Sequence, residues 1–446
     1  AEMSARIAII GAGIAGLAAG RQCRKAGLAA TIFEKDPSPG GRMSSEEVDG
    51  FLIEKAAYTF PEFHRNLTAC LGETGIADSL TATPGTSSTF IAGGEYRIKI
   101  GSPTDFLRYK LLSLKNKKDM IKLFLYAQSL GNALNLAEPG TKTFELEKES
   151  AADYLLEHYD REILEYIAYP IFCEIFLGTP EDNSKAAFLA TLKNLTRFKI
   201  FSFSHGMGML PERLSRDLDV RPATPVLQVV PQSDDGPYRV HYGGDHPGSE
   251  SFDAVIFAIP SPLVPTILDG LSADLKNHFL GVRYSPSVVV ALALDERIEN
   301  TSMINNLGRE DFKTVGTLVF DHHKGPNRMP EGKGLATAIL CEPASRAMLD
   351  ASDEAVVTEV LRDVERIFPG LSGKVIFSRV YRWEHGAVQL PPGALFKQRA
   401  ARDAIEGSFA HIAFAGDGLY KSSLEVSFNT GMSAANRIIE KFGSRA

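Results

Sequence analysis

The spacing of hydrophobic positions along the chain changes several times between the patterns typical of strands and of helices. The first such change, near the N-terminus, is the clearest. Residues 6–10 form an apolar run of the length of one buried strand. Residues 11–20 turn on glycines and continue as small residues typical of a closely packed helix. Residues 31–34 then form a second short strand that ends in an acid. Because strand, helix and strand follow one another closely, residues 6–35 are predicted to form a βαβ unit with parallel strands.

The remaining pattern divides into a helical stretch and several groups of strands. Residues 63–200 have mostly helical periodicity, interrupted by short strands near 88–91 and 96–100. Alternating apolar runs between 265 and 377, with a helix at 355–368, are typical of an antiparallel sheet covered by helices. The other predicted elements are strands at 226–230, 238–241, 253–260, 287–294, 314–320 and 335–340, a strand and glycine turn at 411–418, and a helix at 432–442.

Composition narrows the class of protein. The chain has 446 residues, of which 44% are hydrophobic and 23% charged, so it is long enough for two or three domain-sized cores. A formal net charge of −7 argues against extensive nucleic-acid binding. No uninterrupted apolar run reaches ~18 residues, so no transmembrane helix is predicted. The spacing of the four cysteines predicts no disulfide framework and no metal site, which favours a reducing cytoplasm; they are Cys23, Cys70, Cys173 and Cys341.

The glycine turn after the first strand has the spacing of a dinucleotide-binding fingerprint, Gly11-x-Gly13-x-x-Gly16. One glycine makes the tight bend, one lets the backbone approach a pyrophosphate, and one lets the helix pack against the strand. The helix start at Ile14 and Ala15 adds free N–H groups and the positive end of the helix dipole. The turn is therefore predicted to bind the phosphates of a dinucleotide.

Two neighbouring features support this prediction. Glu34 lies 18 positions beyond Gly16, close to where a carboxylate binds a ribose, and Lys35 follows it. The loop 36–42 then carries Gly41 and Arg42, a combination that suits a phosphate or a flavin edge. The alternative for this loop is a simple surface turn.

Together, these elements resemble the flavin-containing amine oxidase superfamily, which includes protoporphyrinogen oxidases and phytoene desaturases. The resemblance implies a bound FAD, with Gly41 and Arg42 along the cofactor. It also implies a second flavin motif near the C-terminus, where the Gly416-Asp417 turn touches the pyrophosphate and ribitol. The cofactor-binding residues that it implies are Gly11, Gly13, Ile14, Ala15, Gly16, Glu34, Lys35, Gly41, Arg42, Ala57, Tyr58, Val226, Ala258, Pro260, Trp383, Gly416, Asp417, Glu425, Val426 and Ser427.

The resemblance also implies an α/β fold made of two discontinuous domains. A Rossmann-like FAD-binding domain (of the GR2 type, similar to p-hydroxybenzoate hydroxylase) is expected at residues 4–62, 204–264 and 378–446. An α+β substrate domain is expected at residues 63–203 and 265–377, and its first piece is a helical insertion.

The substrate end departs from the monoamine-oxidase branch. His385 stands where those enzymes hold the flavin through a cysteine, so FAD is expected to be non-covalent. Gly386 and Ser423 stand where two aromatic rings would clamp an amine, so that clamp is missing. His385 is the candidate acid or base, with a packing role as the alternative, and Trp383 is a second candidate catalytic residue.

The predicted activity is that of an FAD-dependent oxidoreductase resembling protoporphyrinogen oxidases. It would take a hydride from a C–N or C–C bond of a hydrophobic, cyclic small molecule and pass electrons to O₂ or a quinone. Alternatives within this class are an amine oxidase acting on a small cyclic amine and a carotenoid desaturase or isomerase. Outside it stand a lipid-binding protein similar to GDP-dissociation inhibitors, without flavin chemistry, and a simple NAD dehydrogenase.

The segment 105–137 mixes leucines with lysines and an arginine. This pattern favours a helical lid with a solvated basic face, and peripheral contact with a membrane surface is the alternative. The expected location is therefore cytoplasmic, with the membrane surface left open. The sequence carries no signal for an oligomeric state.

Overall fold

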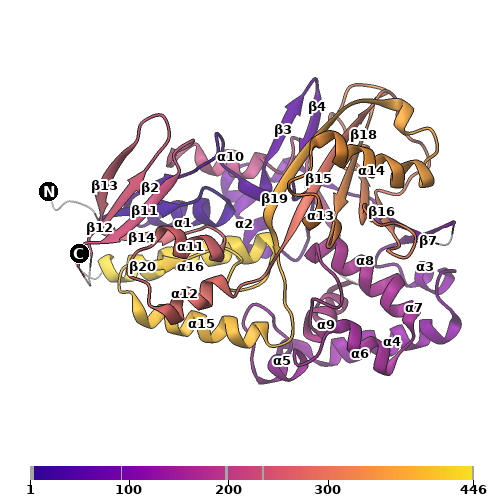
Figure 1. The fold of residues 1–446 in the computed structure, drawn as a ribbon, viewed down its shortest axis with the longest axis horizontal. Coiled ribbons are helices and arrows are strands. Elements are labelled where there is room, and N and C mark those ends of the chain that lie inside the picture. The colour runs from indigo at the N-terminus through magenta and orange to yellow at the C-terminus, as the bar shows by residue number, and fades with distance from the viewer. Residues whose placement is uncertain (1–4, 92, 196–198, 234–235, 444–446) are drawn as a thin grey trace.

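The first predicted strand lies at the centre of a five-stranded parallel sheet. In the computed structural model, which describes residues 5–91, 93–195, 199–233 and 236–443, the strand order is β10-β2-β1-β14-β20 (Figure 1). All four pairings are parallel, as the βαβ pattern predicts. The strands are β1 (Arg6–Ile10), β2 (Ala29–Phe33), β10 (Asp219–Arg221), β14 (Ala254–Phe257) and β20 (Ile412–Phe414).

Helices α1 (Ile14–Lys25) and α16 (Leu424–Gly443) lie side by side against this sheet (Figure 1). Their backbones come very close, because a Cβ added to Gly431 would lie 2.1 Å from the carbonyl oxygen of Ala15. The predicted helix 432–442 starts too late, since α16 begins at Leu424. The polar residues and the glycine before position 432 have low helix propensity, so the sequence pattern did not indicate a helix there. Packing against α1 stabilises these first turns in the folded protein.

A small antiparallel sheet covers the opposite face. It contains β11 (Val226–Pro231), β12 (Tyr238–Tyr242) and β13 (Gly248–Phe252), which confirms the two predicted paired strands. The ring of Phe33 lies with its centroid 5.2 Å from that of Tyr242 and 5.8 Å from that of Phe252. These aromatic contacts join the two sheets in one core.

A seven-stranded sheet forms the second body, in the order β19-β15-β18-β17-β16-β7-β8 (Figure 1). Its pairings are antiparallel except β16 with β7, which are parallel. Helix α14 (Asp353–Ile367) packs Val356, Val360 and Val364 on alternate residues of β15. The strands are β7 (Thr86–Ile91), β8 (Gly94–Lys99), β15 (Tyr284–Leu294), β16 (Ile304–Leu307), β17 (Thr317–Phe320), β18 (Gly334–Leu340) and β19 (Val375–Val388).

The two-domain division stays a prediction. Strands β10, β14 and β20 share a sheet with β1, as the division requires, but the predicted boundary at 377/378 falls inside β19. Ser4 and residues 444–446, which the division includes, lie outside the described residues.

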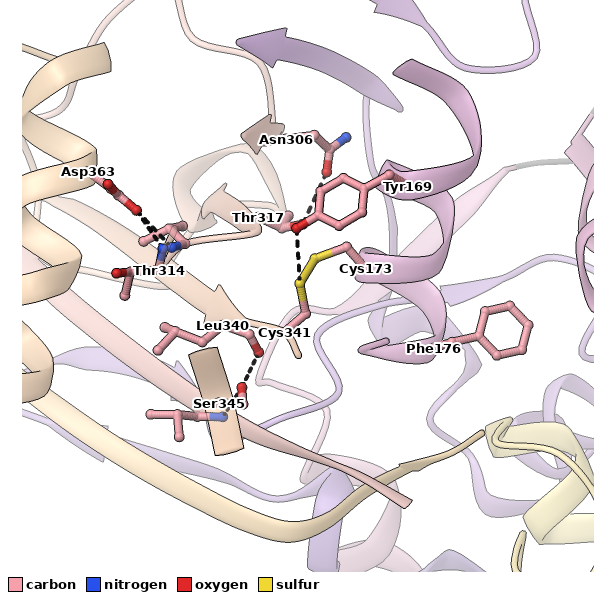
Figure 2. Close-up of a disulfide and its surroundings, with 12 residues drawn as sticks. Tyr169, Cys173, Phe176, Asn306, Thr314, Thr317, Leu340, Cys341, Ser345 and Asp363 are labelled. Carbon is pink, nitrogen blue, oxygen red and sulfur yellow. Dashed lines mark hydrogen bonds between the residues drawn. A yellow bond between two sulfur atoms is a disulfide. The ribbon is translucent and has the colours of Figure 1, made fainter. Parts of the chain in front are cut away.

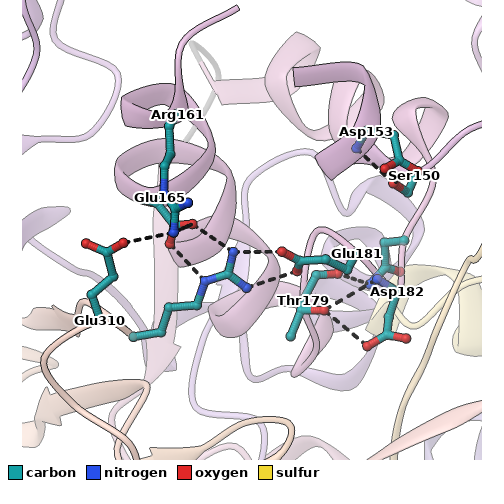
Figure 3. Close-up of polar contacts among 10 residues, drawn as sticks. Ser150, Asp153, Arg161, Glu165, Thr179, Glu181, Asp182 and Glu310 are labelled. Atoms are coloured by element: carbon teal, nitrogen blue, oxygen red, sulfur yellow. Dashed lines mark hydrogen bonds and ion pairs between the residues drawn. The ribbon is translucent and has the colours of Figure 1, made fainter. Parts of the chain in front are cut away.

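The predicted helical insertion packs below the seven-stranded sheet (Figure 1). Arg309, between β16 and β17, donates to Glu165 at 2.8 and 2.9 Å and to Glu181 at 2.7 and 2.9 Å, which ties the insertion to the sheet (Figure 3). Its helices are α3 (Pro103–Arg108), α4 (Leu114–Ser129), α5 (Thr141–Leu146), α6 (Ala151–His158), α7 (Arg161–Ile163), η4 (Leu164–Ala168), α8 (Tyr169–Ile171), η5 (Phe172–Phe176) and α9 (Lys185–Asn194).

A disulfide joins the insertion to the sheet, which corrects the expectation of none. Cys173 on η5 bonds to Cys341 at the end of β18, with Cα atoms 5.7 Å apart across a sequence separation of 168 residues (Figure 2). Sequence spacing could not reveal the pair, because tertiary packing alone brings these residues together. The premise of unpaired cysteines, on which the expected cytoplasmic location rested, is thereby removed.

Short elements connect these bodies. Among the described residues, no helix combines the length and the apolar character needed to cross a membrane. The connecting elements are β3 (Ser45–Val48), β4 (Phe51–Glu54), β5 (Phe60–Pro61), α2 (Arg65–Thr74), β6 (Leu80–Ala82), β9 (Ile200–Phe203), α10 (Met209–Ser215), α11 (Val264–Ile267), α12 (Ala273–Leu280), α13 (Ala344–Ala347) and α15 (Ala394–Ser408).

Candidate cofactor and substrate site

The three glycines of the fingerprint have different surroundings. A Cβ on Gly11 would lie 2.6 Å from the carbonyl oxygen of Ala258, and a Cβ on Gly16 would lie 1.9 Å from that of Gly11. These two glycines are therefore required by packing. A Cβ on Gly13 would meet no atom within 4 Å, so the backbone there borders open space at the start of α1. Helix N–H groups without partners in the helix are available at such a position.

Glu34 is buried directly beside this turn. Its carboxylate accepts the N–H of Ala12 at 2.8 Å and the N–H of Asp36 at 2.9 Å. Burial raises the pKa of Glu34, and these two hydrogen bonds oppose that shift. Lys35 differs, because its exposed ammonium pairs with Asp36 at the surface.

The two predicted flavin motifs meet in one ion pair. Arg42 donates from both terminal nitrogens to the carboxylate of Asp417, at 2.7 and 2.9 Å, and also to the carbonyl of Gly386 at 2.9 Å. Ser422 and Tyr284 donate to the same carboxylate at 2.8 and 3.2 Å. Burial alone would raise the pKa of Asp417, but Arg42 and these hydroxyls hold it below its usual range. Asp417 is therefore a fixed anion.

Both candidate catalytic residues lie on the last part of β19, and His385 lies near enough to Arg42 and Asp417 for their charges to act on its imidazole. The indole N–H of Trp383 donates to the carbonyl of Lys55 at 2.9 Å. The His385 ring stands perpendicular to that of Tyr284, with centroids 5.2 Å apart. Burial lowers the pKa of His385, so its imidazole is neutral near pH 7.

The segment after β4 completes this side of the site. The N–H of Ala57 donates to the carbonyl of Arg42 at 2.9 Å. The hydroxyl of Tyr58 donates to Glu174 of the helical insertion at 3.1 Å. The structure thus places the predicted pair Ala57 and Tyr58 between Arg42 and the insertion.

The other predicted cofactor residues lie around the same edge of the parallel sheet. Val226 begins β11, and the N–H of Ala258 donates to Ile10 at 2.8 Å, with Pro260 two residues later. Glu425 uses its carboxylate to cap α2, accepting the N–H groups of Asn66 and Leu67 at 2.8 and 2.9 Å. Val426 and Ser427 are buried in the first turn of α16.

Four polar residues of this site escaped the sequence analysis. Tyr284 lies just before the predicted strand 287–294, and Glu174 is one of several acids in the predicted helical stretch 63–200. Ser422 follows the Gly416-Asp417 turn closely enough to have been suspected. His64 lies near Ser423, with 3.3 Å between its Nε2 and the hydroxyl oxygen, and nothing in the sequence singled it out.

The open glycines supply a test of whether a dinucleotide fits. Gly13 and Gly416 both border space that a Cβ would enter without meeting protein, and the nearest atom to a Cβ on Gly41 is the Cα of Gly13 at 3.8 Å. Glu34 lies at the first glycine turn, where it accepts the N–H of Ala12. The ion pair of Arg42 and Asp417 lies at the second glycine turn, next to Gly416. The residues present therefore fit FAD. Within the described residues, no cluster of three His, Cys, Asp or Glu side chains is placed to hold a metal ion.

The parallel sheet, the open glycine turn, the buried acid after the second strand and the C-terminal Gly-Asp turn together define an FAD-dependent oxidoreductase. Comparison with known proteins agrees, since a family model for flavin containing amine oxidoreductases matches residues 14–439. The chain belongs to this family, and its cofactor is FAD.

Similar proteins align over nearly the whole chain at low identity. Protoporphyrinogen oxidase 2 of Arabidopsis thaliana is 21% identical, covering 97% of this chain and 94% of the plant protein. Coproporphyrinogen III oxidase of Staphylococcus aureus is 25% identical, covering 98% and 99%. A redesigned putrescine oxidase superposes with a TM-score of 0.80 at 19% identity, covering 99% of each chain. This structural likeness confirms the predicted fold class.

Glu34→Ala is expected to weaken FAD binding by ~1–3 kcal/mol, or about 5- to 150-fold in Kd, which is the effect of losing the buried ribose contact predicted for this carboxylate. The measurement is reconstitution of the FAD-free protein, followed by quenching of flavin fluorescence. Glu34→Gln should lose less, because one oxygen still accepts a backbone N–H. Glu47→Ala, an exposed change on β3, is the control, and equal affinity in all four proteins would place the ribose elsewhere.

Proposed function

We propose that this chain dehydrogenates a hydrophobic, cyclic small molecule at a C–N or C–C bond, in the manner of protoporphyrinogen oxidases. The observation that carries the proposal is the meeting of Arg42, Asp417 and the end of β19 at one point, between the parallel sheet and the seven-stranded sheet. The full-length similarity to proteins named for porphyrinogen oxidation supports the substrate class.

When bound, FAD supplies acceptance of a hydride and two electrons, and the protein supplies orientation and exclusion of water. Gly13 and the start of α1 hold the pyrophosphate, and Glu34 holds the adenosine ribose. Arg42 is itself oriented by Asp417, so its charge is fixed near His385. The neutral imidazole of His385 can accept a proton from the substrate or form a hydrogen bond with it at this position.

FAD is proposed to be non-covalent. Among the described residues, the free cysteines are Cys23 and Cys70, which are buried in helices α1 and α2. The other two form the disulfide. A covalent link through cysteine therefore has no candidate in this region. O₂ or a quinone is the proposed electron acceptor, since the fingerprint at Gly11 is already assigned to FAD.

The test is anaerobic mixing of the FAD-loaded protein with a panel of porphyrinogens, cyclic amines and polyenes. Bleaching of the flavin absorbance by a porphyrinogen or another cyclic compound is expected, because dehydrogenation transfers two electrons to the flavin. Bleaching by linear polyenes alone would contradict the proposed substrate class. Failure of every compound to bleach a fully loaded protein would contradict the proposed activity itself.

A peripheral membrane contact through α3 and α4 is part of the proposal. Leu114, Ile121 and Leu125 lie seven and four positions apart on α4 and are 78%, 42% and 60% exposed, respectively. Such an unpartnered apolar stripe is unusual on a soluble surface, and the exposed basic residues beside it complement an anionic lipid surface. These basic residues are Arg108, Lys110, Lys115, Lys118 and Lys122.

The double change Leu114→Glu with Leu125→Glu is expected to reduce binding to anionic vesicles at least ~10-fold, since each leucine entering the bilayer contributes roughly 1–2 kcal/mol. The measurement is co-sedimentation with vesicles of mixed phosphatidylserine and phosphatidylcholine. Leu280→Glu, on the exposed face of α12, is the matched control. Equal sedimentation of all variants would show that α4 is a lid with a solvated face.

A further inference from the structure

One carboxyl group beside the site has no role in the mechanism described above. Glu174 lies on the π-helical segment η5 and is only half-buried. Its Oε1 accepts the hydroxyl of Tyr58 at 3.1 Å, and no other hydrogen bond or ion pair involves its carboxylate within the described part of the chain. A carboxylate in this setting has an oxygen available to a bound molecule.

The segment that carries Glu174 is fixed on both sides. Cys173, directly before it, is bonded to Cys341 at the end of β18 (Figure 2). The carbonyl of Phe176, two residues after it, accepts the side-chain N–H of Gln389 at 2.6 Å, and Gln389 accepts from Asn183 at 2.8 Å. Glu174 is therefore held in place by the sheet, by the chain after β19 and by the insertion itself. Such fixation is what a reacting group requires.

Tyr58 connects Glu174 to the flavin side of the site. Ala57, its neighbour, donates to the carbonyl of Arg42, which lies along the predicted cofactor. The ammonium of Lys324 lies 4.9 Å from the centroid of the Tyr58 ring and pairs with Asp321 at 2.5 Å. Lys324 is fully buried, so the position of the Tyr58 ring is fixed by a cation that cannot move into solvent.

The pKa of the Glu174 carboxyl is suitable for accepting and releasing a proton near neutral pH. Burial raises the pKa of Glu174 to about 7, and the hydrogen bond from Tyr58 opposes this shift. On this side, Lys324 and Asp321 face Tyr58 and pair with each other. The buried pair of Arg328 and Glu54 lies next to Lys324. A proton acceptor is most effective when its pKa lies near the working pH.

We propose that Glu174 is an acid–base residue of this enzyme, which accepts the proton released from a substrate nitrogen when the adjacent carbon is oxidised. This inference rests on the proposed function and narrows its substrate to one with a CH–NH unit.

The proton balance supports a nitrogen-bearing substrate. Dehydrogenation of a CH–NH unit removes one hydride from carbon and one proton from nitrogen, and the remaining electron pair forms a C=N bond. The hydride and its two electrons leave through the flavin chemistry, and the proton goes to the carboxylate of Glu174. A carboxylate with a pKa near 7 takes a proton from nitrogen far more readily than from an unactivated C–H bond.

The experiment compares flavin reduction by the CH–NH compounds of the panel in wild type, Glu174→Gln, Glu174→Asp and Tyr58→Phe holoenzymes. In wild type, the rate constant should rise with pH through a midpoint near 7. Glu174→Gln should lose this step and be slower by ~10²–10⁴-fold, as expected for loss of a general base. Glu174→Asp should retain the step. Tyr58→Phe should move the midpoint upward, because the hydrogen bond that lowers the pKa of Glu174 is gone.

An infrared titration provides a readout that is independent of turnover. The component of the protonated-carboxyl band that disappears in wild type through a midpoint near pH 7 should be missing from Glu174→Gln. Glu157→Gln, an exposed acid of the same insertion, is the control for both measurements. Glu174→Gln reduction within about twofold of wild type, or an unchanged infrared titration, would overturn the role of Glu174 alone. If no compound bleaches the wild type, the proposed function falls and the role of Glu174 falls with it.

Discussion

Gly13→Val is expected to give a folded protein that purifies without FAD. The backbone of Gly13 has φ −70° and ψ 177°, which any residue adopts, and a Cβ there meets no protein atom. The added isopropyl group therefore leaves the fold intact but occupies the space that the pyrophosphate needs. A loss of FAD affinity of at least ~10³-fold, or about 4 kcal/mol, should follow.

The measurement combines the flavin absorbance per protein chain with the far-UV circular dichroism of the same sample. Gly16→Val is the contrasting variant, because its Cβ would lie 1.9 Å from the carbonyl oxygen of Gly11 and must disrupt the turn itself. Gly140→Ala, at the exposed N-cap of α5 with φ −113° and no atom within 4 Å of the added Cβ, controls for glycine replacement in general. A yellow Gly13→Val protein with normal FAD content would refute the placement of the pyrophosphate.

Arg328→Met is expected to destabilise the protein by ~3–5 kcal/mol, because it leaves a buried carboxylate without its counter-ion. The Arg328 side chain pairs with Glu54, both side chains being fully buried, and also donates to the carbonyl of Phe203 at 2.8 Å. Glu54 in turn accepts the N–H of Met207 at 3.0 Å. This ion pair joins the chain after β17 to the end of β4, and both partners also bond to the residues just before α10. It therefore links the two bodies.

Urea unfolding of the FAD-loaded protein, followed by circular dichroism, measures this effect. The double variant Glu54→Leu with Arg328→Met should recover much of the loss, since no unpaired charge remains. Lys142→Met breaks an exposed pair with Glu145 and should change the free energy of unfolding by less than about 1 kcal/mol. An Arg328→Met protein as stable as this control would mean that the buried pair contributes nothing to stability.

The sequence predicted most of the parallel sheet and the cofactor. Three local features carried this prediction: a continuous apolar run at residues 6–10, glycines at fixed spacing and an acid at position 34. Each of these patterns is typical of one particular structure. The start of α16 was missed because its first turns are polar and contain a glycine, so their helical state depends on packing against α1. Glu54 lies three residues before the predicted cofactor residue Ala57, but its burial against Arg328 could not be seen in the sequence.

By itself, the sequence predicted a dinucleotide turn and a helical insertion, and its resemblance to flavin-containing amine oxidases implied a second flavin motif near the C-terminus. These features depend on neighbouring residues, whose spacing decides their conformation. Only the tertiary structure decided that Arg42 pairs with Asp417, that Cys173 bonds to Cys341, and that Glu174 meets Tyr58. Each of these contacts joins segments more than 100 residues apart, and packing of the two sheets and the insertion brings them together.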